Sequence, residues 1–464
     1  VSRYGTESQD MNTSEMQFKT EEVNMINMLK ENFDKVIILL NVPIMVEAEL
    51  LNDPAIDSVL FVGHPGLTGT KAIAEVLAGA VNPSGHLVDT WAYNAKSAPS
   101  YQSFGNDTTQ SYTGASGYFN AYREGIYVGY RYYATRAMTD NSFNYDENVQ
   151  YSFGYGLSYT TFNKFIQSHS LDKETGEVKV TVGVTNTGNV AGKEVIELYT
   201  HAPYQAGGIE KAWYNLAAFK KTPLIQPNET KYYELSFTLR DIASWDTEKA
   251  YYVLEPGEYE VSLRNDVWHQ AEDETGVHET SFTFNQANLI EYTTSYETGY
   301  PYSSQFAEAE YGPYANEPMT YLSRNDWEGT WKNKADISKA ADKNKIDPYH
   351  NIATSSEMKN DNQIDEDLPQ TGIDSGLTLR DLKDADWDDP NWELLLDQMS
   401  RNEMYNLVDN GGFQTSAVPS ISKAKSTDYD GPAATFHYGT GHPSEVVLAN
   451  TWNVEAALLF GESV

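Results

Sequence analysis

The sequence predicts a multidomain protein of the α/β + β class, and three regions indicate this. Residues 1–160 alternate helix-like and strand-like segments, which is typical of a parallel sheet covered by helices. Residues 161–290 contain short strands of alternating apolar and polar residues, which favours an antiparallel β-sandwich. Residues 376–464 begin another mixed region after a long polar stretch. A chain of 464 residues is long enough for about three domains.

The first region opens with an amphipathic helix. Its apolar residues recur on one helical face: Val23, Ile26, Leu29 and Phe33. Two runs, 36–40 and 59–62, are then apolar without alternation, as expected for parallel strands that are buried on both faces. Residues 71–78 are predicted to form a helix, with Gly79 as its C-terminal stop. This rhythm predicts a parallel or mostly parallel sheet.

The second region is predicted from alternation and from turn residues. Strands are expected at residues 178–182, 194–199, 233–239 and 258–263. Turn signals lie at residues 186–189 and 256–257. The stretch 291–375 is polar, acidic and rich in tyrosine, and its periodicity is weak. We expect it to connect two domains and to pack in part over one of them.

Charge and composition exclude several functions. The formal net charge of −35 argues against nucleic acid and against anionic membrane surfaces, because phosphate contacts require lysine and arginine. The chain has no cysteine, which excludes disulfides, cysteine-bound zinc and a cysteine nucleophile. The candidate histidines lack the spacing of metal ligands: His64, His86, His437 and His442. We therefore expect no metal and no cofactor.

Several motifs, in a fixed order, carry a family resemblance. They are the turn at residues 82–87, the aromatic stretch 122–133, the Gly-rich stretch 153–160, Asp430-Gly431-Pro432 and Thr451-Trp452-Asn453. Together they resemble glycoside hydrolase family three, the β-glucosidases and their relatives.

The resemblance implies four parts. Residues 1–160 resemble the C-terminal part of an α/β sandwich domain, 161–290 a fibronectin type III-like β-sandwich, 291–375 an acidic connecting region, and 376–464 the start of a (β/α)₈-type, TIM-barrel-like catalytic domain. In the commoner order of this family the barrel comes first, whereas here it comes last, as in members with swapped domain order. Such a barrel needs about 250 residues, so we expect it to be incomplete in this chain.

Glu7 is the candidate general acid/base. By itself, a glutamate in the loop Ser2–Asp10 is best explained as a solvated surface residue. The family resemblance changes this, because its members carry a Ser-Arg-x-x-Gly-Glu-Gly-x-Asp loop whose glutamate falls on Glu7. The family's two flanking glycines are replaced here by Thr6 and Ser8.

Asp430 is the candidate substrate-binding residue. An Asp before Gly-Pro is by itself an ordinary turn. In the family, the Asp of this motif holds sugar hydroxyls in the −1 subsite, a task that suits a carboxylate because it accepts charge-assisted hydrogen bonds. Residues 443–445 and 451–453 follow at a family-like spacing.

The family's nucleophile is missing from the sequence. A retaining glycosidase needs a carboxylate nucleophile about 5–5.5 Å from its acid/base. The family supplies it as an Asp in a Ser-Asp-Trp-like motif late in the barrel. Asp241 and Asp386 do not stand in that context. We therefore expect the chain by itself to be inactive.

The resemblance implies a retaining, exo-acting β-glycosidase that hydrolyses terminal β-linked glucose or related sugars from oligosaccharides. Two alternatives remain open at this point. One is a non-catalytic module that binds carbohydrate or a partner, which exposed aromatic rows would favour: Tyr232, Tyr233, Tyr251 and Tyr252. The other is a homodimer or a complementing chain that carries the rest of the barrel. The sequence leaves open whether the protein is in the bacterial cytoplasm, on the cell surface or secreted.

Overall fold

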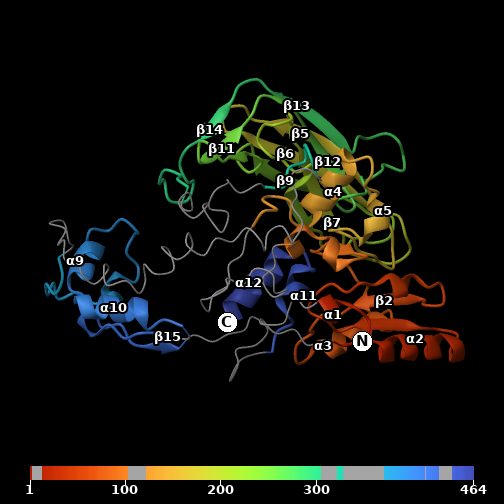
Figure 1. Ribbon diagram of the computed structural model, residues 1–464, viewed down its shortest axis with the longest axis horizontal. Helices are drawn as coiled ribbons and strands as arrows, with labels where there is room; N and C mark the ends of the chain where they lie inside the picture. Colours follow the sequence, from red (N-terminus) through yellow and green to blue (C-terminus); the bar gives the residue numbers. More distant parts are fainter. Residues whose placement is uncertain are drawn as a thin grey trace, which may run out of the picture. The chain divides into compact units, whose positions relative to one another are not determined.

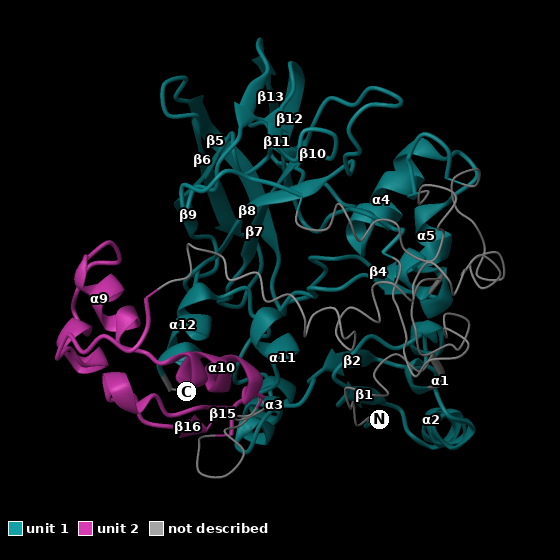
Figure 2. Ribbon diagram, turned by 60° about the vertical axis from the view of Figure 1, so that its left-hand side comes forward, with its two compact units in different colours: residues 1–347, 443–463 teal, residues 348–442, 464 magenta. Residues whose placement is uncertain are grey.

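The computed structural model describes residues 1–2, 13–102, 122–304, 321–327, 370–412, 414–427 and 441–463. The chain divides into two compact units (Figure 2). The first contains residues 1–347 and 443–463, and the second contains residues 348–442 and 464. Within the described part of the chain, no helix is long and apolar enough to cross a membrane.

Residues 1–160 contain two parallel strands, as the sequence predicts. The main elements are α2 (Thr20–Asn32), β1 (Ile37–Leu40), β2 (Ser58–Phe61) and α3 (Gly69–Leu77). β1 pairs with β2 in parallel, with Ile37 opposite Ser58 and Leu40 opposite Phe61. The helical face ends earlier than predicted. Ile26 is fully buried, but Phe33 lies beyond the end of α2 in extended backbone and is 62% exposed.

The rest of this region consists of short elements that pack around an aromatic core. These elements are α1 (Thr13–Met16), β3 (Trp91–Ala92), α4 (Tyr130–Thr139), α5 (Tyr145–Asn148) and β4 (Val149–Tyr151), and β3 pairs with β4. Leu322 and Trp327 of the connecting region are buried in this core, next to Tyr127 and Tyr132. The expectation that part of the connecting region packs over a domain is therefore confirmed for residues 321–327.

Residues 162–292 form a β-sandwich, whose strands lie together in Figure 1. One antiparallel sheet contains β5 (Phe162–Leu171), β6 (Glu177–Asn186) and β9 (Thr230–Thr238). A second has the order β13-β12-β7-β8, formed by Ser281–Gln286, Gly257–Arg264, Val195–His201 and Asn215–Lys221. A small third sheet joins β10 (Ser244–Asp246), β11 (Tyr251–Leu254) and β14 (Ile290–Tyr292).

The sandwich core follows the predicted alternation on β6. Val178, Val180, Val182 and Val184 are fully buried and face Ile196, Leu198, Val261 and Leu263 of the second sheet, all within one apolar cluster. β7 is different, because every residue from Val195 to Thr200 is buried. Its second face contacts the first region, where Tyr199 joins the aromatic core.

The second unit has a small core of its own. Its elements are α9 (Asn391–Asp397), α10 (Arg401–Asp409) and the paired strands β15 (Gln414–Thr415) and β16 (Ser426–Thr427). Leu395 and Met399 are buried in this core. Residues 443–463, with α11 (Glu445–Ala449) and α12 (Val454–Ser463), belong instead to the first unit. The assignment of 376–464 to a barrel domain stays a prediction.

Candidate functional site

Both predicted site residues lie outside the described part of the chain. Glu7 is in the stretch 3–12, and Asp430 is in the stretch 428–440. The structure does describe the residues on either side of each stretch. Their contacts show where the two stretches join the fold.

The Glu7 loop leaves the fold at the carboxyl end of β1. Ser2 forms a parallel bridge with Asn41, the residue that directly follows β1. The amide of Asn41 also donates to the carbonyl of Val1 at 2.9 Å. On the far side of the loop, Met16 of α1 is buried, and its carbonyl accepts from the amide of Glu47 at 2.8 Å. The loop is thus tied to the fold at both ends.

The chain after Asp430 joins the fold at the carboxyl end of β2. The amide of Ser444 donates to the carbonyl of His64 at 2.8 Å, and the amide of His64 donates to Ser444 Oγ at 3.4 Å. Val447 packs so closely on Gly63 that a side chain at that position would collide with it. Since β1 and β2 are parallel neighbours, both attachments lie at the same edge of one sheet. In open α/β sheets, ligands bind outside the carboxyl ends of the strands.

The same C-terminal segment is held by Asn450 and Trp452. The carbonyl of Asn450 accepts from the amide of His86 at 2.9 Å, and its Oδ1 accepts from the amide of Val88 at 3.1 Å. Trp452 is 5% exposed and donates from Nε1 to the carbonyl of His86 at 3.1 Å. Its ring meets Phe153 and Phe219 edge to face, at centroid distances of 5.4 and 5.2 Å. The Thr451-Trp452-Asn453 motif therefore has a packing role in this structure.

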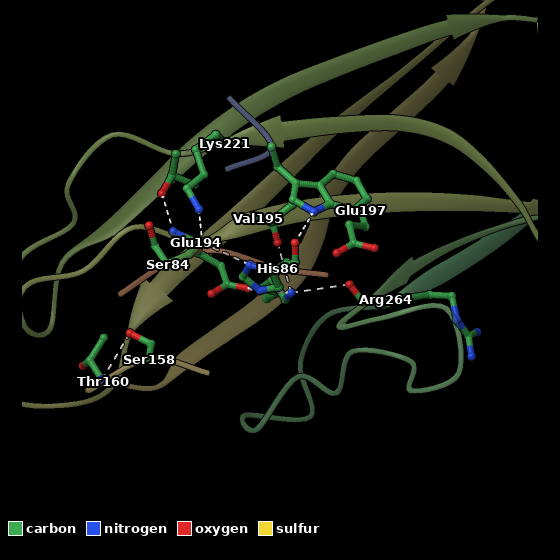
Figure 3. A network of polar contacts seen from close by, with 12 residues as sticks. Ser84, His86, Ser158, Thr160, Glu194, Val195, Glu197, Lys221 and Arg264 are labelled. Atoms are coloured by element: carbon green, nitrogen blue, oxygen red, sulfur yellow. Dashed lines mark hydrogen bonds and ion pairs between the residues drawn. The ribbon is translucent and has the colours of Figure 1, made fainter. Parts of the chain in front are cut away.

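A buried polar network includes His86, whose carbonyl accepts from Trp452 (Figure 3). Lys164 Nζ donates to Glu194 Oε1 at 2.9 Å and to the carbonyl of Val195 at 3.2 Å. His86 Nε2 lies 3.8 Å from the same Glu194 oxygen, and its Nδ1 is 3.1 Å from the carbonyl of Ser84. All three side chains are at most 10% exposed. The network joins the first region to the sandwich.

Burial controls the charges in this network. It lowers the pKa of His86 to about 4, so the imidazole is neutral near pH 7. It also lowers the pKa of Lys221, which contacts the Ser84 carbonyl, to about 8. Burial opposes ionisation of Glu194, but the charges of Lys164 and Lys221 and the contacts with Lys164 and His86 together outweigh it and lower the pKa of this carboxyl. The result is one buried ion pair beside a neutral histidine.

Glu197 is a second buried carboxyl on this face. It is completely buried, and burial raises its pKa well above the ordinary value. Tyr199 donates to its Oε2 at 2.7 Å. Gly154 lies against the carboxyl group with a φ of +87°, so a side chain there would collide with Glu197. This contact explains why the Gly-rich stretch 153–160 has glycine at that position.

Sequence reasoning did not find Lys164, Glu194 or Glu197 as buried groups. Glu197 lies in β7, between the core-facing residues Ile196 and Leu198, so alternation alone would place it toward solvent. The first region covers that face of the strand and buries it instead. Glu194 directly precedes β7 and is buried against Lys164 and His86. One sequence signal was available, because His86 stands where the family motif usually has arginine.

No metal site is found in the described ranges, where no three His, Cys, Asp or Glu side chains gather closely enough to hold an ion. Two cavities lie in the first unit. One, of about 430 Å³, has Lys96, Arg136 and Trp327 in its lining, with no carboxylate among the described lining residues. The other, of about 590 Å³, borders β2 and has one described carboxylate, Asp57. Neither has the two carboxylates that a retaining glycosidase needs.

Comparison with known protein families assigns the two main regions. Residues 1–130 match the glycosyl hydrolase family 3 C-terminal domain, and residues 194–267 match the fibronectin type III-like domain. The chain is β-glucosidase-like, with a glycosyl hydrolase family 3 C-terminal domain and a fibronectin type III-like domain. The family 3 domain includes the Glu7 loop and both strands of the parallel pair.

Relatives and solved structures agree with family 3. Beta-glucosidase A of Butyrivibrio fibrisolvens is 37% identical over 53% of this chain and 30% of its own length. The crystal structure of a β-glucosidase from Paenibacillus barengoltzii is 25% identical, with a TM-score of 0.66 over 96% of this chain and 46% of that one. Beta-glucosidase 3B of Thermotoga neapolitana, in complex with α-D-glucose, is 30% identical with a TM-score of 0.52 over 63% of this chain and 38% of that one. The matches thus cover less than half of these relatives.

Proposed function

We propose that the chain is part of a retaining, exo-acting β-glycosidase that removes terminal β-linked glucose or related sugars from oligosaccharides. The observation that carries this proposal is the shared edge of the parallel pair. The Glu7 loop departs next to Asn41, and the segment after Asp430 returns next to His64. The names of the related β-glucosidases support the substrate class.

In this proposal Glu7 and Asp430 have different roles. Glu7 protonates the glycosidic oxygen as the aglycone leaves and later removes a proton from the attacking water. Asp430 accepts hydrogen bonds from hydroxyl groups of the terminal sugar and so fixes the ring. The attack on the anomeric carbon requires a carboxylate nucleophile, which the sequence of this chain does not provide in the family's context.

We therefore propose that the chain does not turn over glycosides by itself. The remaining barrel residues would be supplied elsewhere in the same polypeptide or by a complementing chain. The acidic connecting region 291–375 and the swapped domain order fit this arrangement. The match of the Paenibacillus barengoltzii β-glucosidase to 96% of this chain supports the order of the parts.

The test is an assay with a chromogenic aryl β-glucoside, with and without a barrel polypeptide that carries the nucleophile. We expect no hydrolysis by the chain alone and measurable hydrolysis once the barrel is supplied. Glu7→Gln should then lower kcat/KM about 100-fold or more for a poor leaving group, and far less for an activated one that needs no protonation. Glu15→Gln, in the adjacent α1, is the matched control. Full activity of Glu7→Gln on both substrates would refute the assignment.

A further inference from the structure

A row of aromatic side chains crosses the small sheet of the sandwich. In the strand register, Trp245 of β10 lies opposite Tyr252 of β11, and Tyr252 lies opposite Tyr292 of β14. Residues directly opposite each other in adjacent strands point to the same face. The three rings therefore follow one another across all three strands of this sheet.

The loop after β14 adds further rings to this row. Tyr302 packs against Trp245 and Tyr252, at centroid distances of 5.9 and 5.4 Å, and Trp245 and Tyr252 are themselves 5.0 Å apart. Bonds between Thr293 and Tyr302 and between Ser295 and Tyr300 hold the loop back on itself. The loop thus places Tyr302 against the rings of the sheet.

Arg240 ties this surface together. Its guanidinium lies 5.0 Å from the ring centre of Tyr292 and 5.9 Å from that of Tyr296. It also donates to the carbonyl of Thr294 and, at 3.3 Å, to the hydroxyl of Tyr302. A cation in this position orders the rings before any ligand arrives, which reduces the entropy lost on binding.

Much of this ring area is exposed to solvent. Tyr296 is 85% exposed, Tyr300 is 74% exposed and Tyr252 is 39% exposed. Tyrosine and tryptophan combine an apolar face with a polar edge, so a cluster of them suits ligands that have both apolar and hydroxyl-bearing faces. Exposed clusters of large side chains commonly mark binding surfaces.

The charges around the rings exclude a polyanion. Carboxylates lie on or next to the same strands and loop: Asp241, Asp246, Glu248, Glu291 and Glu297. The nearby cations are already engaged, since Lys249 pairs with Glu291 at 2.8 Å and Arg240 stacks on the rings. Nucleic acid needs a basic surface beside its stacking rings, and this surface is acidic. Neutral sugars satisfy both features, because their hydroxyls donate to carboxylates and their ring faces pack on aromatics.

We propose that this aromatic surface, formed by Trp245, Tyr252, Tyr292, Tyr296, Tyr300 and Tyr302, binds a neutral β-linked glucan chain. The linkage of that glucan rests on the proposed function, whereas the existence of the surface does not. The surface would hold a polymeric substrate on the fibronectin type III-like region independently of hydrolysis. It differs from the aromatic rows expected from the sequence, because Tyr232 lies on β9 of another sheet and Tyr233 is 9% exposed.

A protein partner is the competing occupant of such a surface, since aromatic residues and arginine are also enriched at protein interfaces. The sugar is favoured because the most exposed rings stand on a turn among carboxylates, where a neutral hydroxyl-rich ligand meets no repulsion. A second copy of this chain would bring the same acidic residues against each other.

The test is native gel electrophoresis of the full 464-residue chain in gels that contain hydroxyethyl cellulose, a soluble β-linked glucan. We expect the wild-type protein to be retarded. The double variant Tyr296→Ala and Tyr300→Ala should bind about tenfold more weakly or worse, at unchanged thermal stability, because these rings are exposed. Tyr252→Ala should weaken binding in the same direction. Tyr232→Ala is the matched control, since it removes a tyrosine that is 57% exposed on a different sheet.

Three results would overturn the proposal. One is wild-type migration that does not change with hydroxyethyl cellulose, and another is equal retardation of the double variant. The third is a wild-type dimer in solution that the double variant abolishes, which would assign the surface to self-association. Equal retardation by dextran, an α-linked glucan, would refute the β-linked assignment. In one further result, hydroxyethyl cellulose retards the protein while the chain, supplied with the barrel, hydrolyses no aryl β-glucoside. That result would count against the proposed catalytic role and not against the binding surface.

Discussion

The sandwich and the parallel pair differ in where their stabilising contacts come from. The sandwich buries its core with strands from one continuous stretch, residues 162–292. In the described residues the parallel sheet has two strands, and residues 443–450, which come from far along the chain, attach to it at His64 and to the first region at His86. A sheet of this kind depends on remote segments, because two strands alone bury too little apolar surface. The sandwich should therefore unfold largely as a unit, whereas the first region should respond to changes at remote positions.

The largest expected effect is in the buried ion pair of the sandwich. Lys164→Ala leaves Glu194 without its cation, and breaking a buried pair in this way destabilises by about 3–5 kcal/mol. We expect a matching decrease in the free energy of unfolding, measured by urea denaturation. Adding Glu194→Met should recover part of the loss, since it removes the unpaired charge. Lys179→Met, at a 46% exposed lysine on neighbouring β6, is the control. A loss below about 1 kcal/mol would show that water reaches the pair.

A slightly smaller effect is expected at Trp452. Trp452→Ala removes its contacts with Phe153 and Phe219 and its bond to His86, and large aromatic deletions cost about 3 kcal/mol or more. Hydrogen exchange should accelerate at Ile38 and Leu40 of β1, while Val180 and Val182 of β6 stay protected. Trp387→Ala is the control, because that side chain is 96% exposed. Equal acceleration in both regions would contradict the difference between them.

The pH dependence of stability tests the contact between the first region and the sandwich, at His86. His86 has a pKa of about 4 when folded and about 6.5 when unfolded. Between these values the unfolded chain binds more protons, so stability is full above pH 6.5 and is lost as the pH falls toward 4. The loss amounts to about 3 kcal/mol. We expect His86→Gln to flatten the curve of unfolding free energy against pH in this window. An unchanged slope would assign the acid sensitivity to other groups, such as Glu194.

The smallest effect is expected at the attachment near β2. Ser444→Ala removes the side-chain acceptor of the His64 amide but leaves the backbone bond between the two residues. One such bond contributes about 1 kcal/mol. Hydrogen exchange at Val62 and His64 should rise several-fold, without a change in the sandwich. The exposed Ser170→Ala is the control. No change at either amide would mean that Val447 and Trp452 hold the segment without Ser444.

Periodicity and turn residues predicted most of the elements whose apolar residues follow a regular pattern. The runs at 36–40 and 59–62 became β1 and β2, and the alternation at 178–182 became the centre of β6. These signals succeed because burial on one or both faces of a strand acts directly on its own residues. The end of the first long helix was missed. The apolar pattern continues to Phe33, but α2 ends at Asn32 and the backbone of Phe33 is extended.

The residues of the candidate site were predicted from motifs. Motifs do not specify the geometry of a site. Glu7 and Asp430 came from a family resemblance, and they stay predictions because both lie outside the described residues. What the structure adds is the attachment of their flanking segments at Asn41 and His64. The two attached segments, at Ser2 and Ser444, are more than 400 residues apart in the sequence. No local periodicity could predict that they meet at one edge of the sheet.

The sequence alone predicted the mixed α/β and β class of the fold and the resemblance to β-glucosidases, because these depend on local patterns and ordered motifs. Tertiary structure alone decided three further features. It buried Glu197 by covering the second face of β7, it placed Trp452 against Phe153 and Phe219, and it gathered the aromatic surface from β10, β11, β14 and the following loop. The physical reason is common to all three. Desolvation and ring packing depend on which segments meet in space, and a residue's own neighbours in sequence do not specify that.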